Sequence, residues 1–225
     1  NRFKLFEGAA RRFTYLEMSE EVDRIAEALR ANGLGVGSLV ASQFPNVTEM
    51  IVFYFAVAKI GAILSPISAS YRSAELRAAS QTVDFDGYVS IATMSGKPYY
   101  HERLGALPPS VKLLGFGTGL PEGVVRLDDG QELGKPAETM LATDRSADDL
   151  FAVFWTSGTE GLPKAVPKTH NNMMASSLGA WRLLGLDDGA NILAPFPFVN
   201  AAAMGGLMMC WMRTAGALVL HHPFD

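Results

Sequence analysis

The stretch WTSGTEGLPK occupies residues 155–164 and decides how the rest of the chain is interpreted. An apolar run from Leu150 to Trp155 leads into it, which predicts a buried strand. The pattern from Asn171 to Leu184 follows it and predicts a helix. A short loop rich in glycine and hydroxyl side chains, placed after such a strand, is typical of a site that wraps an anion.

Each kind of group in this loop suits a polyphosphate. The hydroxyls donate hydrogen bonds, the glycines let backbone amides approach an anion closely, and the lysine adds a full positive charge. The candidate phosphate-binding residues are Thr156, Ser157, Gly158, Thr159, Gly161 and Lys164. The alternative interpretation is an ordinary surface turn that happens to contain a lysine. The order of residues after an apolar strand favours the functional interpretation.

Two better-known phosphate loops are excluded by spacing. The Walker pattern has two glycines separated by four residues and then Lys-Ser or Lys-Thr. Here Gly158 and Gly161 are separated by two residues, and Lys164 is followed by Ala165. The dinucleotide fingerprint G-x-G-x-x-G is absent as well. A P-loop kinase or NTPase is therefore not expected.

The composition of the 225 residues is that of a protein with a sizeable core. Hydrophobic residues make up 48% of the chain and charged residues 19%, with a net charge of −4. Without a dense basic cluster, nucleic acid is not an expected partner. The single Cys210 favours a reducing compartment, and we expect a cytoplasmic protein. The apolar segment Ala201–Met212 is too short for a membrane span, which needs about 20 residues, and it predicts a buried helix.

Strand and helix patterns alternate in the first half. We expect a hairpin of Phe3–Phe6 with Arg12–Tyr15, a helix from about Ser19 to Ala31 capped by Ser19, and Asn46 as the N-cap of the next helix. The further expected strands are Leu39–Phe44, Ala62–Pro66, Asp86–Ile91 and Val111–Phe116, and the further helices cover about 47–60 and 74–81. Continuous apolar strands alternating with helices predict an α/β fold, with mostly parallel sheets covered by helices on both faces.

The region 117–147 is rich in glycine, proline and acidic residues and shows little periodicity, which predicts a long connector. We therefore expect a first α/β subdomain over 1–147. Residues 148–225 are expected to hold the phosphate-loop strand and the start of a second, truncated α/β subdomain. Its further elements would be strands at Asn191–Ala194 and Ala217–His221 around a helix near 202–212.

The loop, read from Phe154 to Val166 and followed by Thr169-His-x-Asn, resembles the phosphate-loop motif of the adenylate-forming superfamily. This superfamily includes acyl-CoA and aryl-CoA synthetases, adenylation domains of peptide synthetases, and beetle luciferases. Three further segments resemble family motifs: Phe13–Met18 the early "fTYxEL", Ala56–Pro66 the "aixkaGaxxxPi" and Ala194–Phe198 the "lPlfH". The resemblance covers essentially the whole chain and implies the first part of the large N-terminal domain of such an enzyme.

The resemblance implies a two-step reaction that uses ATP and Mg²⁺. A carboxylate attacks the α-phosphate of ATP to give an acyl-adenylate and pyrophosphate, and a thiol of CoA or a carrier protein then takes the acyl group. The six loop residues named above match the family's grip on the β- and γ-phosphates. Phe198, Val199 and Asn200 follow as candidates for the acid pocket, and they favour an aromatic or compact apolar acid.

Three residues depart from the family pattern. Glu160 stands where Thr or Ser is common, and it either points outward or helps to bind a cation. Ala165 replaces a usual Gly, with a minor effect expected. Phe198 replaces a frequent His and is either an aromatic wall of the acid pocket or part of the core.

Several family segments have no counterpart in these 225 residues. They are the segment that stacks on adenine and supplies a magnesium-binding Glu, the Asp that holds the ribose, and the C-terminal domain with its catalytic Lys. We therefore expect an N-terminal fragment that holds no catalytic residue and is inactive alone, completed by the missing C-terminal portion of the same enzyme. The alternative is a naturally short, non-catalytic nucleotide or phosphate binder. The pair His221-His222 is not expected to bind a metal.

Overall fold

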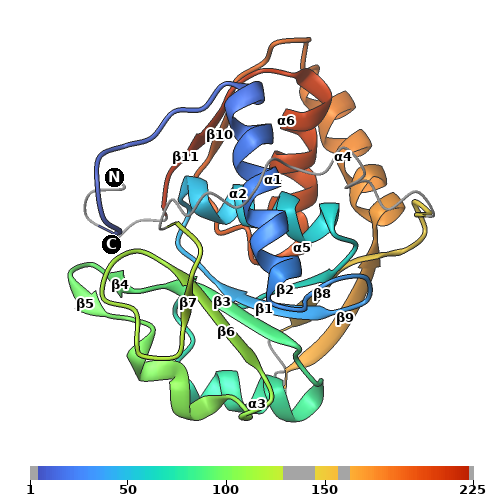
Figure 1. Ribbon diagram of the computed structural model, residues 1–225. Coiled ribbons are helices and arrows are strands. Elements are labelled where there is room, and N and C mark those ends of the chain that lie inside the picture. The colour runs from blue at the N-terminus through green and yellow to red at the C-terminus, as the bar shows by residue number, and fades with distance from the viewer. Residues whose placement is uncertain (1–4, 129–144, 157–162, 223–225) are drawn as a thin grey trace.

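The computed structural model describes residues 5–128, 145–156 and 163–222. A seven-stranded sheet runs through the molecule in the order β7-β6-β3-β1-β2-β8-β9 (Figure 1). All of its neighbouring strands are parallel except β8 and β9, which are antiparallel. Its strands are β1 (Leu39–Gln43), β2 (Ile63–Pro66), β3 (Gly87–Ile91), β6 (Lys112–Phe116), β7 (Val125–Arg126), β8 (Leu150–Thr156) and β9 (Lys164–Thr169).

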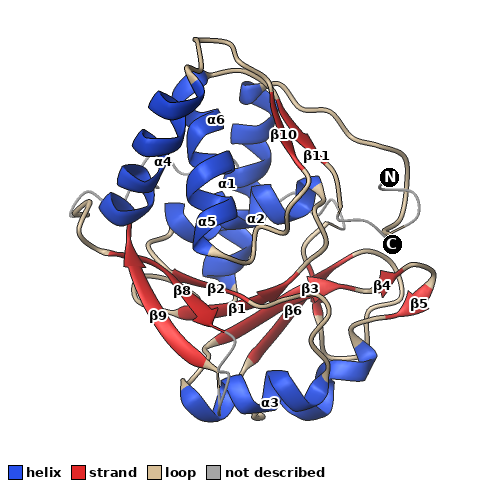
Figure 2. Ribbon diagram, turned by 180° about the vertical axis from the view of Figure 1, so that it is seen from behind, coloured by secondary structure: helices blue, strands red, loops and turns tan. Residues whose placement is uncertain are grey.

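Helices cover both faces of this sheet (Figure 2). On one face lie α1 (Tyr15–Ala31) and α2 (Thr48–Lys59), and on the other lie α3 (Ser73–Thr82) and the 3₁₀ helix η2 (His101–Ala106). Because side chains alternate between the two faces of a strand, a strand covered on both sides is buried along its whole length, as β3 is with all five residues buried. The predicted α/β fold is confirmed.

The start of α1 differs from the prediction. The helix is capped by Thr14, whose hydroxyl accepts a hydrogen bond from the Glu17 N–H, while the Glu17 carboxylate accepts one from the Thr14 N–H. This capping box satisfies helix-end amides one turn before Ser19, so the expected cap at Ser19 is wrong. The expected hairpin is wrong too, because Tyr15 is helical and residues 5–14 form no strand.

The sequence did not predict β9. It runs antiparallel to β8 directly after the loop, and α4 (His170–Leu184) begins only where β9 ends. β9 is an edge strand of the sheet and contains Pro167. An edge strand tolerates a proline that a central strand excludes, and this proline concealed the strand pattern.

A two-stranded parallel sheet of β10 (Ile192–Ala194) and β11 (Leu218–Leu220) lies beside α1 in Figure 1. The chain crosses from β10 to β11 through α5 (Ala201–Ala203), the π-helical turn η3 (Met204–Met208) and α6 (Met209–Thr214). A separate short hairpin pairs β4 (Thr93–Met94) with β5 (Lys97–Pro98).

The seven-stranded sheet extends across the expected division at residues 147 and 148, since β8 pairs with β2. One hydrophobic core joins the helices of the first half to α6 and β10. The sheet and the core are thus shared by both parts of the chain. The division into two subdomains remains a prediction.

Candidate functional site

Thr156 and Lys164 lie opposite each other at the ends of β8 and β9. Paired residues on antiparallel strands project from the same face of the sheet, so the hydroxyl and the ammonium group lie on one side. Both residues are exposed. The remaining candidates between them, Ser157, Gly158, Thr159 and Gly161, lie outside the described residues, as does Glu160. The described pair forms the mouth of the predicted phosphate loop.

This mouth lies at a favourable edge of the sheet. β8 runs parallel to β2, so Thr156 is at the same edge as the carboxyl ends of β1, β2 and β3. In open α/β sheets, ligands bind in the crevice outside the carboxyl ends of the strands. The sheet therefore presents a hydroxyl and a cation at the edge where a ligand is expected.

Trp155 fixes the strand end just before the loop. Its Nε1–H donates a hydrogen bond of 2.9 Å to the Ser65 hydroxyl on β2, and its ring packs against Phe85 in an edge-to-face arrangement with centroids 6.3 Å apart. Ser65 is fully buried. No local sequence pattern predicts this bond, because its partners are 90 positions apart.

His170 lies directly after β9 and contacts the start of β8, at the end of the β8–β9 pair opposite the loop. Its backbone N–H donates to the Asp149 carbonyl at 3.2 Å, and its ring contacts Phe151 with centroids 5.1 Å apart. Burial lowers the pKa of His170 below its usual value, while Asp149 acts in the opposite direction. Thr169 caps α4 with a second capping box. His170 therefore helps to start the helix.

The three acid-pocket candidates follow β10. The Phe198 side chain is fully buried within the hydrophobic core. Val199 is partly buried. Asn200 is exposed and accepts a hydrogen bond of 2.8 Å from the Ala203 N–H, which caps α5. A role of these residues in an acid pocket remains a prediction.

Asn46, in the loop after β1, connects the segment after β10 to the seven-stranded sheet through hydrogen bonds. Its side chain donates hydrogen bonds to the carbonyls of Ala194, Phe196 and His221 at 3.4, 2.8 and 3.0 Å. The expected role of Asn46 as an N-cap is wrong, because Val47 occupies that position in α2. The Asn46 backbone N–H donates to His222 Nδ1 at 3.2 Å.

Within the described ranges, no three His, Cys, Asp or Glu side chains lie close enough together to hold a metal ion. The same part of the chain contains no helix that is both long and apolar enough to cross a bilayer.

The mostly parallel α/β sheet carries a Thr–Lys pair at its carboxyl edge, an arrangement that suits an anionic ligand. The sequence model described as "AMP-binding enzyme" matches residues 2–225, and the chain belongs to this family.

Named relatives agree with this assignment. The chain is 33% identical over 196 residues to crotonobetaine/carnitine–CoA ligase of Salmonella paratyphi A, covering 83% of this chain and 36% of that relative. The ATP-bound structure of MatB from Rhodopseudomonas palustris matches with a TM-score of 0.75 and 25% identity over 96% of this chain and 41% of that one.

The structure of the anthranilate CoA ligase AuaEII with anthranoyl-AMP has a TM-score of 0.84 over 98% of this chain and 43% of that one. At 20% identity it supports the fold alone. The chain thus spans 36% of the length of the first curated relatives that it matches.

Proposed function

We propose that the whole protein is an ATP-dependent carboxylic acid ligase. In the first step a carboxylate oxygen attacks the α-phosphorus of ATP, and the bond to pyrophosphate breaks. In the second step a thiol sulfur attacks the acyl carbon of the adenylate, AMP leaves, and the thiol proton passes to solvent. The observation that carries this proposal is the exposed Thr156–Lys164 pair at the carboxyl edge of the sheet, in a chain of the AMP-binding enzyme family.

The contribution of this chain is a grip on the leaving pyrophosphate. Lys164 neutralises negative charge as it develops on the β- and γ-phosphates, and Thr156 donates a hydrogen bond. Ser157, Gly158, Thr159 and Gly161 complete the grip in this proposal. Trp155 holds the strand end in place through Ser65, which keeps the loop mouth pre-organised before ATP arrives.

The acid is proposed to be small, and aromatic or compact apolar. The apolar character of the segment Ala194–Phe198 supports this class. The curated relatives act on crotonobetaine or carnitine by their names, which are both small acids. CoA is the thiol in those names, so we favour CoA over a carrier protein.

Mg²⁺ belongs to the proposal through the family, but the described residues provide no ligand cluster for it. Its carboxylate ligand is expected outside this chain, and we derive no step through the metal. The adenine, ribose and lysine elements are likewise expected in the missing C-terminal portion. We therefore propose that the 225-residue chain alone does not form adenylates, and that the protein is cytoplasmic.

A panel of carboxylic acids tests the function directly. The full-length protein is incubated with ATP, Mg²⁺, CoA and one acid at a time, and pyrophosphate release is measured. We expect release that depends on both ATP and the acid, strongest with small aromatic or compact apolar acids. ATP binding without release for any acid would instead support a non-catalytic nucleotide binder.

A further inference from the structure

The segment after β10 has little regular structure to hold it. Residues 195–200 form neither helix nor strand, and Phe196 is 62% exposed. A loop keeps one position only where side chains or backbone groups elsewhere hold its polar atoms. The groups that bind this loop therefore determine where any ligand wall that it forms will lie.

Asn46 supplies the first set of these bonds. It lies just after β1 and is 5% exposed. Its amide reaches the ends of both short strands, since it donates to Ala194 at the end of β10, to Phe196 beyond it and to His221 after β11. One buried side chain from the loop after β1 thus holds the carboxyl ends of the two-stranded sheet.

Phe198 is held from two directions. Its backbone N–H donates to Asn46 Oδ1 at 3.4 Å, and its carbonyl accepts from the Tyr54 hydroxyl of α2 at 3.3 Å. Tyr54 is 1% exposed and the Phe198 ring is fully buried. Moving Phe198 therefore breaks two buried hydrogen bonds, each of which costs more to lose inside the protein than in water.

We propose that Asn46 and Tyr54 are positioning residues for the acid: they fix the backbone of the segment 194–198 and so set the position of the acid-pocket wall. This inference rests on the proposed function and deepens it. Neither residue touches substrate in this account, since both act through the Phe198 backbone. Loosening this backbone weakens acid binding but leaves the grip on ATP unchanged, because the Thr156–Lys164 pair belongs to a different strand pair.

The variant Tyr54→Phe in the full-length enzyme tests this most cleanly, because it removes one hydroxyl and keeps the ring. The control is Tyr99→Phe, which removes a similarly buried hydroxyl that donates to the Ala69 carbonyl at 2.7 Å. We expect Tyr54→Phe to raise KM for the acid about fivefold to tenfold with KM for ATP within about twofold, the effect of a slightly misplaced binding wall. The control should leave both within about twofold. An equal rise in both KM values, or the same change in the control, overturns the proposal.

Hydrogen exchange of the full-length protein gives a readout that needs no activity. We expect faster amide exchange at Phe198 and its neighbours in Tyr54→Phe, and in Asn46→Ala if that variant folds, but not in Tyr99→Phe. Unchanged exchange there in Tyr54→Phe contradicts the anchoring itself. Faster exchange in a protein that uses no acid would instead show that the anchoring is correct and the proposed function is wrong.

Discussion

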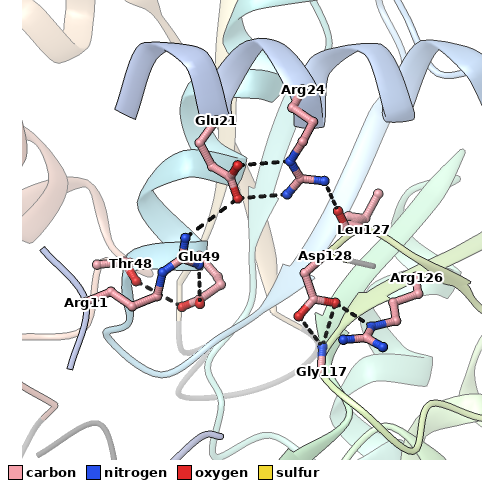
Figure 3. A network of polar contacts seen from close by, with 9 residues as sticks. All are labelled: Arg11, Glu21, Arg24, Thr48, Glu49, Gly117, Arg126, Leu127 and Asp128. Carbon is pink, nitrogen blue, oxygen red and sulfur yellow. Dashed lines mark hydrogen bonds and ion pairs between the residues drawn. The ribbon is translucent and has the colours of Figure 1, made fainter. Parts of the chain in front are cut away.

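Two polar junctions lie three positions apart at the start of α2 and differ in kind. Asn46 is a buried neutral amide that joins the ends of two sheets. Glu49 is a buried carboxylate, 4% exposed, that accepts hydrogen bonds from Arg11 at 3.2 Å and from Thr48 at 3.1 Å (Figure 3). The Asn46 junction contacts the segment with the acid-pocket candidates, whereas the Glu49 junction contacts the N-terminal segment through Arg11.

The charged junction at Glu49 belongs to a network of ion pairs that joins α2 to α1. Arg11 also contacts Glu21 of α1 at 4.0 Å, and Glu21 pairs with Arg24 on the same helix (Figure 3). Arg24 in turn donates a hydrogen bond to the carbonyl of Leu127, which directly follows β7. Arg11 is 38% exposed, so water and salt reach this network. We infer that the neutral junction determines the geometry of the site, whereas the charged junction mainly ties down the N-terminal segment.

The largest expected effect comes from the neutral junction. Asn46→Ala leaves the buried carbonyl of Ala194 and the partly buried carbonyls of Phe196 and His221 without this donor, and we expect a loss of roughly 2–3 kcal/mol in the free energy of unfolding. Urea denaturation measures this loss. A loss below that of Arg11→Ala would contradict the ranking of the two junctions.

Arg11→Ala is expected to cost less, about 1 kcal/mol, because the arginine is partly exposed. Its cost should shrink when the denaturation is repeated with about 0.5 M added salt, whereas the cost of Asn46→Ala should not change. Equal salt dependence for the two variants would show that charge does not distinguish the junctions.

The smallest expected effect concerns pH and the base of the hairpin. Burial lowers the pKa of His170, so between its folded value and the unfolded value near 6.5 the unfolded chain binds more protons. The stability that this group contributes is complete above that unfolded value and is lost as the pH falls through the folded one.

His170→Gln should therefore lose less stability than the wild type between about pH 7.5 and pH 5.5. Denaturation curves at the two pH values measure the difference. An identical pH dependence in both proteins would exclude His170 as its source.

The sequence predicted most strands and helices because their patterns are local. The run Leu150–Trp155 is apolar throughout and became β8, and the pattern from Asn171 became most of α4. The wrong prediction for the start of α1 has a local competitor as its cause. Two residues suited to an N-cap, Thr14 and Ser19, lie five positions apart, and only the first completes a capping box.

The candidate site was predicted less completely. Thr156 and Lys164 were identified from loop chemistry, and the structure pairs them on neighbouring strands. A short polar residue before a helix usually caps it, so the sequence predicts a cap role for Asn46. Its actual partners lie 148 to 175 positions away, and no periodic pattern in one sequence connects such distant residues.

The most direct test of the central claim is ATP–pyrophosphate exchange by the full-length protein with Lys164→Ala and a matched control, Lys168→Ala, on the same strand. If Lys164 grips the leaving pyrophosphate, its removal should lower exchange about 100-fold or more, mainly through ATP, while the control stays within about threefold. Equal losses in the two variants, or a change for Lys164→Ala confined to KM of the acid, would contradict the assigned role.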